Sequence, residues 1–191
     1  MSKKYELTKE TKTLAGGTVL HRIRALRDIP RFGVKAGQLG GFVEGEINLS
    51  QDGDAWVYGD AWVFGNAWVS DNARVFGNAK VYGNAKVYDN AKVYGNAKVY
   101  DNAWVFGNAN VSSDADYMVI KNIWSSGRWF TYTSSNKKWA VGCFYGTGEE
   151  LVAKAYKDSK LSGKCYEAIV HAVETIEAAK AKAKGESNGS K

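Results

Sequence analysis

A six-residue repeat in the middle of the chain is the feature that most limits its fold. Valine recurs at every sixth position from Val57 to Val111, and an alanine stands two places before each valine, from Ala55 to Ala109. An α-helix would repeat its apolar residues about every 3.6 positions, and a continuous strand would alternate without interruption. Here four alternating residues are followed by a two-residue turn. The repeat therefore predicts a parallel β-helix over residues 55–116, with three short strands and three corners in each coil.

The alternation assigns each side chain of a repeat to the inside or the outside of the coil. Alanine and valine share one side of a strand, and the residue between them and the residue after valine share the other. The small alanine fits the crowded interior near a corner, and valine fills the middle. Turn pairs such as Gly65-Asn66 and Asp89-Asn90 use residues that tolerate positive φ. Ten repeats give about three and a third coils, roughly 16 Å tall, with Asn72, Asn90 and Asn108 at one corner, able to form a stacked amide ladder.

The repeats resemble the family of left-handed β-helices with hexapeptide repeats, the fold of many bacterial acyltransferases. The Val and Ala series correspond to the aliphatic and small positions of that family, and the left hand of the helix is implied by the resemblance. Further segments resemble hexapeptide-repeat proteins of phages and prophages whose function is uncharacterised: residues 5–8, 22–26, 39–41, 48–50 and 141–150. The resemblance implies a phage origin and a trimer.

The flanks of the repeats predict three further parts. Residues 1–54 are expected to form short strands that cap the first coil, because an open coil end is an exposed sheet edge. Residues 117–184 predict an antiparallel meander followed by two helices. Thr147 and Glu150 have the spacing of a capping box for the first helix, with Leu151, Val152, Ala155 and Tyr156 on its apolar face. A second helix over about 163–184 would bury Tyr166, Ile169, Val170, Val173 and Ile176. Residues 185–191 are expected to be a disordered tail.

Composition narrows the location and the partners. No apolar run reaches the length of a membrane span, and no signal-peptide core follows the N-terminus. The two cysteines, Cys143 and Cys165, make no disulfide framework. We therefore expect a protein of the bacterial host cytoplasm that does not enter the membrane. The net charge of +6 lies mainly in the C-terminal third, and no part of the chain resembles a strongly basic nucleic-acid-binding domain, so we do not expect duplex nucleic acid as a partner.

Candidate catalytic and metal-binding residues are few. The only histidines, His21 and His171, lie outside the repeats, whereas hexapeptide acyltransferases place a histidine base beside the thioester. Cys143 is expected inside a buried strand, and Cys165 lies near a helix start. Residues 37–41 are glycine-rich but lack the spacing of a phosphate loop, so they predict a turn. Four turn aspartates, which are Asp71, Asp89, Asp101 and Asp114, do not form a cation site by themselves. We expect no enzymatic activity, no metal and no cofactor.

The outward-facing residues carry the clearest functional pattern. Three tryptophans come first, at Trp56, Trp62 and Trp68, and the same repeat position then becomes basic while the residue after valine stays aromatic. The predicted ligand-binding residues are Arg74, Lys80, Tyr82, Lys86, Tyr88, Lys92, Tyr94, Lys98 and Tyr100, with Phe76 beside Arg74. One interpretation is strand propensity combined with charges that prevent aggregation. The other is a recognition surface, in which cations bind phosphate and aromatic rings stack on a ligand.

A second basic cluster and the tryptophans extend this surface. Arg22, Arg24, Arg27 and Arg31 lie close together in the sequence and are a secondary candidate for an anionic ligand. The outward tryptophans predict a cover, either a partner subunit in a homo-oligomer or the N-terminal flank.

Three functional hypotheses remain. The first is a non-catalytic oligomeric binding protein, encoded by a phage, that sequesters an anionic, nucleotide-like signal of host defence or blocks a host protein. The second is a structural, virion-associated assembly module. The third is a hexapeptide-repeat acyltransferase, which would bind acetyl-CoA.

Overall fold

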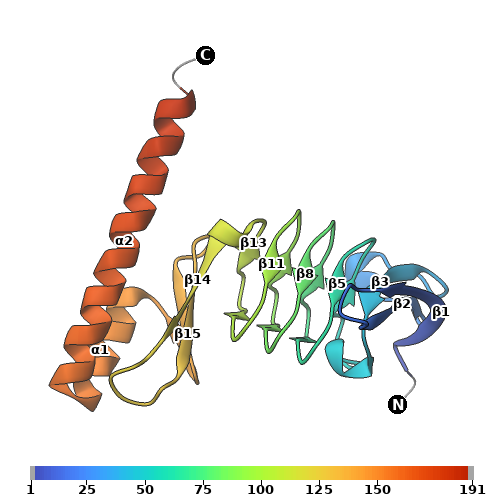
Figure 1. Cartoon of the computed structure of the whole chain (residues 1–191), viewed down its shortest axis with the longest axis horizontal. Helices are drawn as coiled ribbons and strands as arrows, with labels where there is room; N and C mark the ends of the chain where they lie inside the picture. Colours follow the sequence, from blue (N-terminus) through green and yellow to red (C-terminus); the bar gives the residue numbers. More distant parts are fainter. Residues whose placement is uncertain (1–2, 189–191) are drawn as a thin grey trace. The chain divides into compact units, whose positions relative to one another are not determined.

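The protein is mainly β, as shown by a computed structural model that describes residues 3–188 and the side chains of residues 3–183 (Figure 1). The chain divides into two compact units, Met1–Val119 and Ile120–Lys191. The first contains a parallel β-solenoid with its N-terminal flank, and the second contains antiparallel strands and two helices.

The solenoid is built from two-residue strands, one in each repeat. They are β4 (Trp56–Val57), β5 (Trp62–Val63), β6 (Trp68–Val69), β7 (Arg74–Val75), β8 (Lys80–Val81), β9 (Lys86–Val87), β10 (Lys92–Val93), β11 (Lys98–Val99), β12 (Trp104–Val105) and β13 (Asn110–Val111). Every third strand pairs in parallel, so that the orders are β4-β7-β10-β13, β5-β8-β11 and β6-β9-β12. Arg74 lies beside Lys92, and Lys80 beside Lys98. This confirms the three-sided coil of stacked parallel strands, with about four turns.

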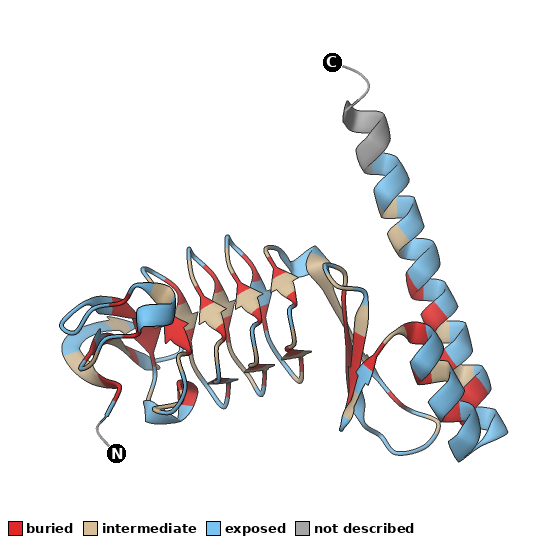
Figure 2. Cartoon of the chain, turned by 180° about the vertical axis from the view of Figure 1, so that it is seen from behind, coloured by how far each residue is buried: buried red, intermediate tan, exposed pale blue. Residues whose placement is uncertain are grey.

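The interior of the solenoid consists of the two periodic residues of the repeat. Each alanine from Ala55 to Ala109 and each valine from Val57 to Val111 is fully buried. Buried segments, drawn in red, accordingly recur from coil to coil in Figure 2. From Gly59 to Gly107, the first residue of each turn has positive φ, and aspartate takes this place at Asp71, Asp89 and Asp101 with φ between 55° and 57°. Ser113, which follows the last repeat, has φ of −148° and precedes a short 3-10 helix. The predicted inside and turn positions are therefore confirmed.

Amide pairs between coils occur at two corners. Asn66 Nδ2 donates to Asn84 Oδ1 at 3.2 Å, and Asn78 Nδ2 donates to Asn96 Oδ1 at 3.3 Å. The sequence predicted such a ladder at the third corner, formed by Asn72, Asn90 and Asn108.

At this third corner, carboxylates make the side-chain contacts between coils instead. Asp71 Oδ2 accepts from the backbone N–H of Asp89 at 3.4 Å, and Asp89 Oδ2 accepts from that of Gly107 at 3.1 Å. The side-chain amide oxygen of Asn90 accepts a hydrogen bond from the guanidinium group of Arg31 at 2.8 Å.

The N-terminal flank closes the first coil, as the sequence predicts. Strands β1 (Tyr5–Thr13), β2 (Val19–Ala25) and β3 (Leu39–Val43) are antiparallel neighbours, and β3 pairs in parallel with β5. One solenoid sheet is thereby extended to the order β1-β2-β3-β5-β8-β11. Two short 3-10 helices, η1 (Pro30–Phe32) and η2 (Glu46–Asn48), lie on either side of β3 in the sequence.

The glycine-rich segment, residues 37–41, allows the flank to lie close to the first coil. Gly37 is in a turn with φ of 85°, but Gly40 and Gly41 lie inside β3, so the prediction of a turn holds only for its first part. A Cβ atom at Gly40 or Gly41 would lie 2.6 Å from the carbonyl oxygen of Val57 or Ala61, respectively. Only glycine lets β3 lie this close to the coil.

The flank also covers part of the tryptophan belt. Trp56 is fully buried and meets the edge of the Tyr5 ring, with 6.4 Å between ring centroids. Trp62 is half-buried, whereas 39% of Trp68 is exposed. The chain itself therefore covers Trp56, one of the two covers that the sequence allowed.

Lys4 is a buried cation at the junction of flank and solenoid. Its Nζ donates to the carbonyl oxygens of Asp52 at 3.2 Å and Ala55 at 2.9 Å. Burial lowers the pKa of Lys4 from 10.5 to about 8, and repulsion by Arg27 acts in the same direction. The carboxylates of Asp54 and Asp52 oppose this shift.

The second unit contains the expected meander and helices. The antiparallel sheet has the order β14 (Tyr117–Lys121), β15 (Trp129–Thr133), β16 (Lys138–Val141) and β17 (Phe144–Gly146). Strand β14 crosses the boundary between the units after Val119, and η3 (Asp114–Asp116), in the first unit, precedes it. Helices α1 (Gly148–Asp158) and α2 (Lys160–Asn188) follow. Helix α2 is longer than predicted and includes residues 185–188, which the sequence assigned to the tail; residues 189–191 lie outside the described part.

The capping box of α1 is confirmed. Thr147 Oγ1 accepts from the backbone N–H of Glu150 at 3.2 Å, and Glu150 Oε2 accepts from that of Thr147 at 2.7 Å. The hydrogen bond from the backbone N–H of Thr147 holds the pKa of the Glu150 carboxyl below its ordinary value.

Most residues predicted to be buried in the helices are buried, but Tyr156 and Ile176 are exposed at 42% and 44%. The Tyr156 hydroxyl donates to Glu167 of α2 at 2.7 Å, so this residue joins the helices at their rim. Ile176 lies just beyond Val173, the last buried residue among the described side chains of α2.

Cys143 corrects another expectation. The sequence placed it inside a buried strand, but β16 ends at Val141 and β17 begins at Phe144, so Cys143 lies in the turn and is exposed. In the described part of the chain, no helix has both the length and the apolar composition of a membrane span.

The interior assignment predicts the effect of a charge at Val87. Val87→Asp would bury an unpaired carboxylate and should lower the free energy of unfolding by about 3–5 kcal/mol or prevent folding. Lys86→Asp introduces the same group on the outward side of β9 and should keep the fold. Circular dichroism during thermal unfolding compares the two, and a Val87→Asp protein that melts with the wild type would show that the faces are assigned wrongly.

The buried Lys4 predicts a rise of stability with pH. Below pH 8 it is protonated in both the folded and the unfolded chain, whereas between pH 8 and 10.5 only the unfolded chain keeps the proton. The penalty for burying the charge is therefore relieved as pH increases, and from pH 7 to 9 the unfolding free energy should gain about 1 kcal/mol.

Urea unfolding at both pH values measures this gain. Lys4→Met should lack it, and Lys9→Met, at an exposed position of β1, should retain it. The same gain in wild type and Lys4→Met would contradict the assignment.

Candidate functional site

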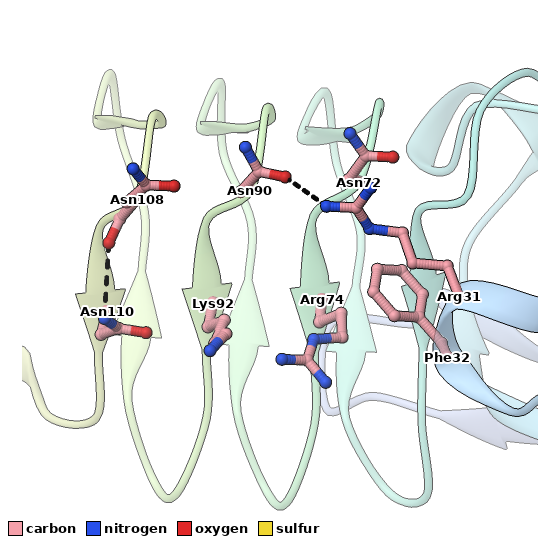
Figure 3. A pocket seen from close by; sticks show the side chains of 8 residues that line it. All are labelled: Arg31, Phe32, Asn72, Arg74, Asn90, Lys92, Asn108 and Asn110. Atoms are coloured by element: carbon pink, nitrogen blue, oxygen red, sulfur yellow. Dashed lines mark hydrogen bonds between the residues drawn. The ribbon is translucent and has the colours of Figure 1, made fainter.

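A polar groove of about 510 Å³ lies on the outside of the first unit (Figure 3). Two columns of side chains form it, each with one residue per coil. The first column is Asn72, Asn90 and Asn108 at a corner, and the second is Arg74, Lys92 and Asn110 on β7, β10 and β13; Arg31 and Phe32 of η1 close one end. All lining residues belong to the solenoid and its flank.

The second column follows directly from strand pairing. Arg74 pairs with Lys92, and Lys92 pairs with Asn110. Neighbouring strands are about 4.8 Å apart, so the column spans about 10 Å. Its members are fixed by backbone hydrogen bonds such as Arg74 N–H to the Ala91 carbonyl at 2.9 Å. The groove is therefore built on a rigid element.

The closing residues are held by a small loop. Ile29 and Val34 are buried and form an antiparallel bridge. Between them, Gly33 has φ of 67° and its N–H donates to the Pro30 carbonyl at 3.2 Å. This tight turn presents Arg31 and Phe32 to the groove.

Two arginines share the ring of Phe32. The guanidinium carbon of Arg31 lies 5.8 Å from the ring centroid and that of Arg74 lies 5.0 Å from it, within the range of cation–π attraction. Arg74 is also 5.9 Å from the centroid of Phe76. Arg31 donates to Asn90 Oδ1, as the dashed line in Figure 3 shows.

The charge of the groove is positive at one end. Arg31, Arg74 and Lys92 line it, and its other lining residues are four asparagines and Phe32. Within the described side chains, the ion pairs involve other cations than these three. Burial raises the pKa of the neighbouring Tyr58, and the charge of Arg74 partly offsets this. The site is thus cationic and has no carboxylate of its own.

As an 18-residue coil predicts, the basic ladder is divided among three faces. Arg74 and Lys92 share the groove, whereas Lys80 and Lys98 lie on the sheet of β5, β8 and β11. Lys86 lies on the third face between Trp68 and Trp104, with its Nζ 4.9 Å from the Trp104 ring centroid. Lys80 Nζ lies 4.1 Å from the Trp62 ring. Only two residues of the ladder thus line the groove.

The predicted aromatic residues stack on one another from coil to coil. The stacked pairs are Phe64–Tyr82 at 5.1 Å, Tyr82–Tyr100 at 5.3 Å, Phe76–Tyr94 at 5.0 Å and Tyr88–Phe106 at 4.5 Å between ring centroids. Stacking between coils therefore gives these rings a structural role without a ligand.

The secondary cluster is dispersed as well. Arg22 pairs with Glu10 at 2.8 Å and lies 4.4 Å from the Phe42 ring centroid, and Arg24 pairs with Glu6. Arg27 donates to the carbonyl of Gly53 at 3.2 Å. Only Arg31 reaches the groove.

Sequence reasoning did not assign the asparagines or Phe32 to a site. Asn72, Asn90 and Asn108 were expected at one corner, but as an amide ladder. The signal for a site was that Arg74, Lys92 and Asn110 follow them two residues later. No sequence pattern indicated that Phe32 would line the groove, since its position depends on how the η1 loop folds onto the coil.

The candidate catalytic residues lie elsewhere. His21 Nδ1 is 3.3 Å from the carbonyl oxygen of Thr8, and His171 is an exposed residue of α2. The described residues include no group of three or more His, Cys, Asp or Glu side chains arranged to hold a metal ion.

Comparison with other proteins does not identify the chain. No protein-family model matches it, and no curated protein matches it.

Proposed function

We propose that this protein is a non-catalytic binding protein that captures a small anionic molecule in the groove of Arg31, Arg74 and Lys92. The observation that carries the proposal is the presence of three cations in one groove that contains no carboxylate. Each of them belongs to a fixed element, either the η1 loop or a solenoid strand.

An anion would complete this arrangement electrostatically. Like charges held close together repel, and a bound anion turns this repulsion into charge-assisted hydrogen bonds. Each such bond contributes roughly 1.5–3 kcal/mol. Because the strands are already in place, little conformational freedom is lost on binding.

The biological setting rests on the resemblance of the chain to hexapeptide-repeat proteins of phages. In that setting the ligand is a nucleotide-like signal of host defence in the bacterial cytoplasm, and the protein lowers its free concentration by binding. The acyltransferase alternative has less support, because neither His21 nor His171 lines the groove.

The triple variant Arg31→Gln/Arg74→Gln/Lys92→Gln tests the proposal. Calorimetric titration with phosphate, pyrophosphate and linear and cyclic nucleotides should show binding to the wild type and at least 10-fold weaker binding to the variant. The matched control, Lys80→Gln/Lys86→Gln/Lys98→Gln, removes the same charge outside the groove and should bind like the wild type. Equal binding by all three folded proteins would show that the groove is not the binding site. Loss of binding in the control alone would show the same.

We also propose a homo-oligomer, a trimer by the resemblance. Trp68 supports it, since 39% of this large apolar side chain is exposed beside Lys86 after the flank has covered Trp56. Light scattering should give about three times the chain mass of 20.9 kDa. Trp68→Ser should shift the mass toward the monomer, whereas Trp129→Ser, which removes a similarly exposed tryptophan of the second unit, should not. A wild-type mass of one chain would contradict the proposal and leave an assembly role without support.

A further inference from the structure

We infer that the groove selects a phosphorylated sugar or polyol, with the phosphate at the Arg31–Arg74–Lys92 end and hydroxyl groups at the Asn108–Asn110 end. This inference rests on the proposed anion-binding function and adds the class and the orientation of the ligand.

The two ends of the groove differ in charge. Along the solenoid axis, the strand column begins with Arg74, continues with Lys92 and ends with the neutral Asn110. Arg31 adds a further cation at the Arg74 end, as Figure 3 shows. A ligand that is anionic throughout would leave part of its charge beside amides, so the groove fits a molecule with one charged end and one neutral polar end.

The neutral end can donate and accept hydrogen bonds. Each asparagine side chain offers an N–H₂ donor and a carbonyl acceptor, and hydroxyl groups need both. Asn110 Nδ2 donates to the backbone carbonyl of Asn108 at 3.3 Å, which orders the two residues relative to each other. These two amides lie two residues apart in the chain and therefore suit neighbouring hydroxyls.

The size of the groove agrees with such a ligand. Its volume of about 510 Å³ falls in the range of small-molecule sites, roughly 300–1,000 Å³. The column from Arg74 to Asn110 spans about 10 Å, two strand spacings. Most small-molecule sites are lined mainly by apolar side chains, whereas Phe32 alone lines this one with an aromatic or aliphatic side chain. A polar ligand is thus favoured.

A nucleobase would gain little in this groove. Base stacking requires a free aromatic face, but the ring of Phe32 already contacts the guanidinium groups of Arg31 and Arg74. Nearby, Phe76 and Tyr94 stack on each other. The protein should therefore bind a nucleotide through its phosphate and ribose and be indifferent to its base.

Calorimetric titration with four probes tests this inference: inorganic phosphate, ribose 5-phosphate, AMP and adenosine. We expect ribose 5-phosphate to bind at least 10-fold tighter than phosphate, AMP to bind within about threefold of ribose 5-phosphate, and adenosine not to bind. Equal affinity for phosphate and ribose 5-phosphate would overturn the inference and leave the anion site. AMP binding more than 10-fold tighter than ribose 5-phosphate would overturn it in favour of base recognition.

A variant of the neutral end separates the two proposals. Asn108→Ala/Asn110→Ala should reduce ribose 5-phosphate binding to the level of phosphate and leave phosphate binding unchanged, and Asn102→Ala, at another corner, should change neither. A double variant that binds ribose 5-phosphate like the wild type would contradict the inference. Absence of binding by phosphate, ribose 5-phosphate and AMP to the wild type would instead refute the proposed function itself.

Discussion

Backbone hydrogen bonds between successive coils hold the first unit in register, and its other features depend on them. The N–H of Trp62 donates to the carbonyl of Ala79 at 2.9 Å, and equivalent bonds recur along the solenoid. Such bonds form only if each coil has the same length as the next. The regular turn meets this condition, because glycine or aspartate adopts positive φ at its first position. The fully buried alanines and valines then stack in columns inside.

The same register brings distant residues together on the outside. Arg74, Lys92 and Asn110 are far apart in sequence but occupy neighbouring strands of one sheet. Arg31 joins them only because β3 pairs with β5 and carries the flank, with its η1 loop, onto the coil. The candidate site thus combines a periodic part, which comes from the solenoid, with a unique part, which comes from the flank.

The periodic part was predictable and the unique part was not. The interior, the turns, the three faces and the capping box of α1 follow from local rules of alternation, turn conformation and helix capping. The position of Phe32 depends on tertiary packing of the η1 loop, and the exposure of Cys143 depends on where β16 ends. Ile176 fits the apolar pattern of α2 but lies beyond the last buried position among its described side chains. The division of the basic ladder among three faces also follows from the 18-residue coil, but which of its members would line a groove depends on where the η1 loop packs.

Strict stacking also restricts how such a chain can change its length. An insertion of three whole repeats would add one complete coil, keep every column on its own face and lengthen the groove by one strand spacing. An insertion of a single repeat before Arg74 would preserve the interior just as well, but it would rotate all later residues onto the next face. Arg74 and Lys92 would then no longer lie on the same face of the solenoid as Arg31. Upstream of Asn110, the interior accepts insertions in units of six, whereas the columns of the groove stay on one face only with insertions in units of eighteen. Homologues with the same groove should therefore differ in this part of the solenoid by whole coils.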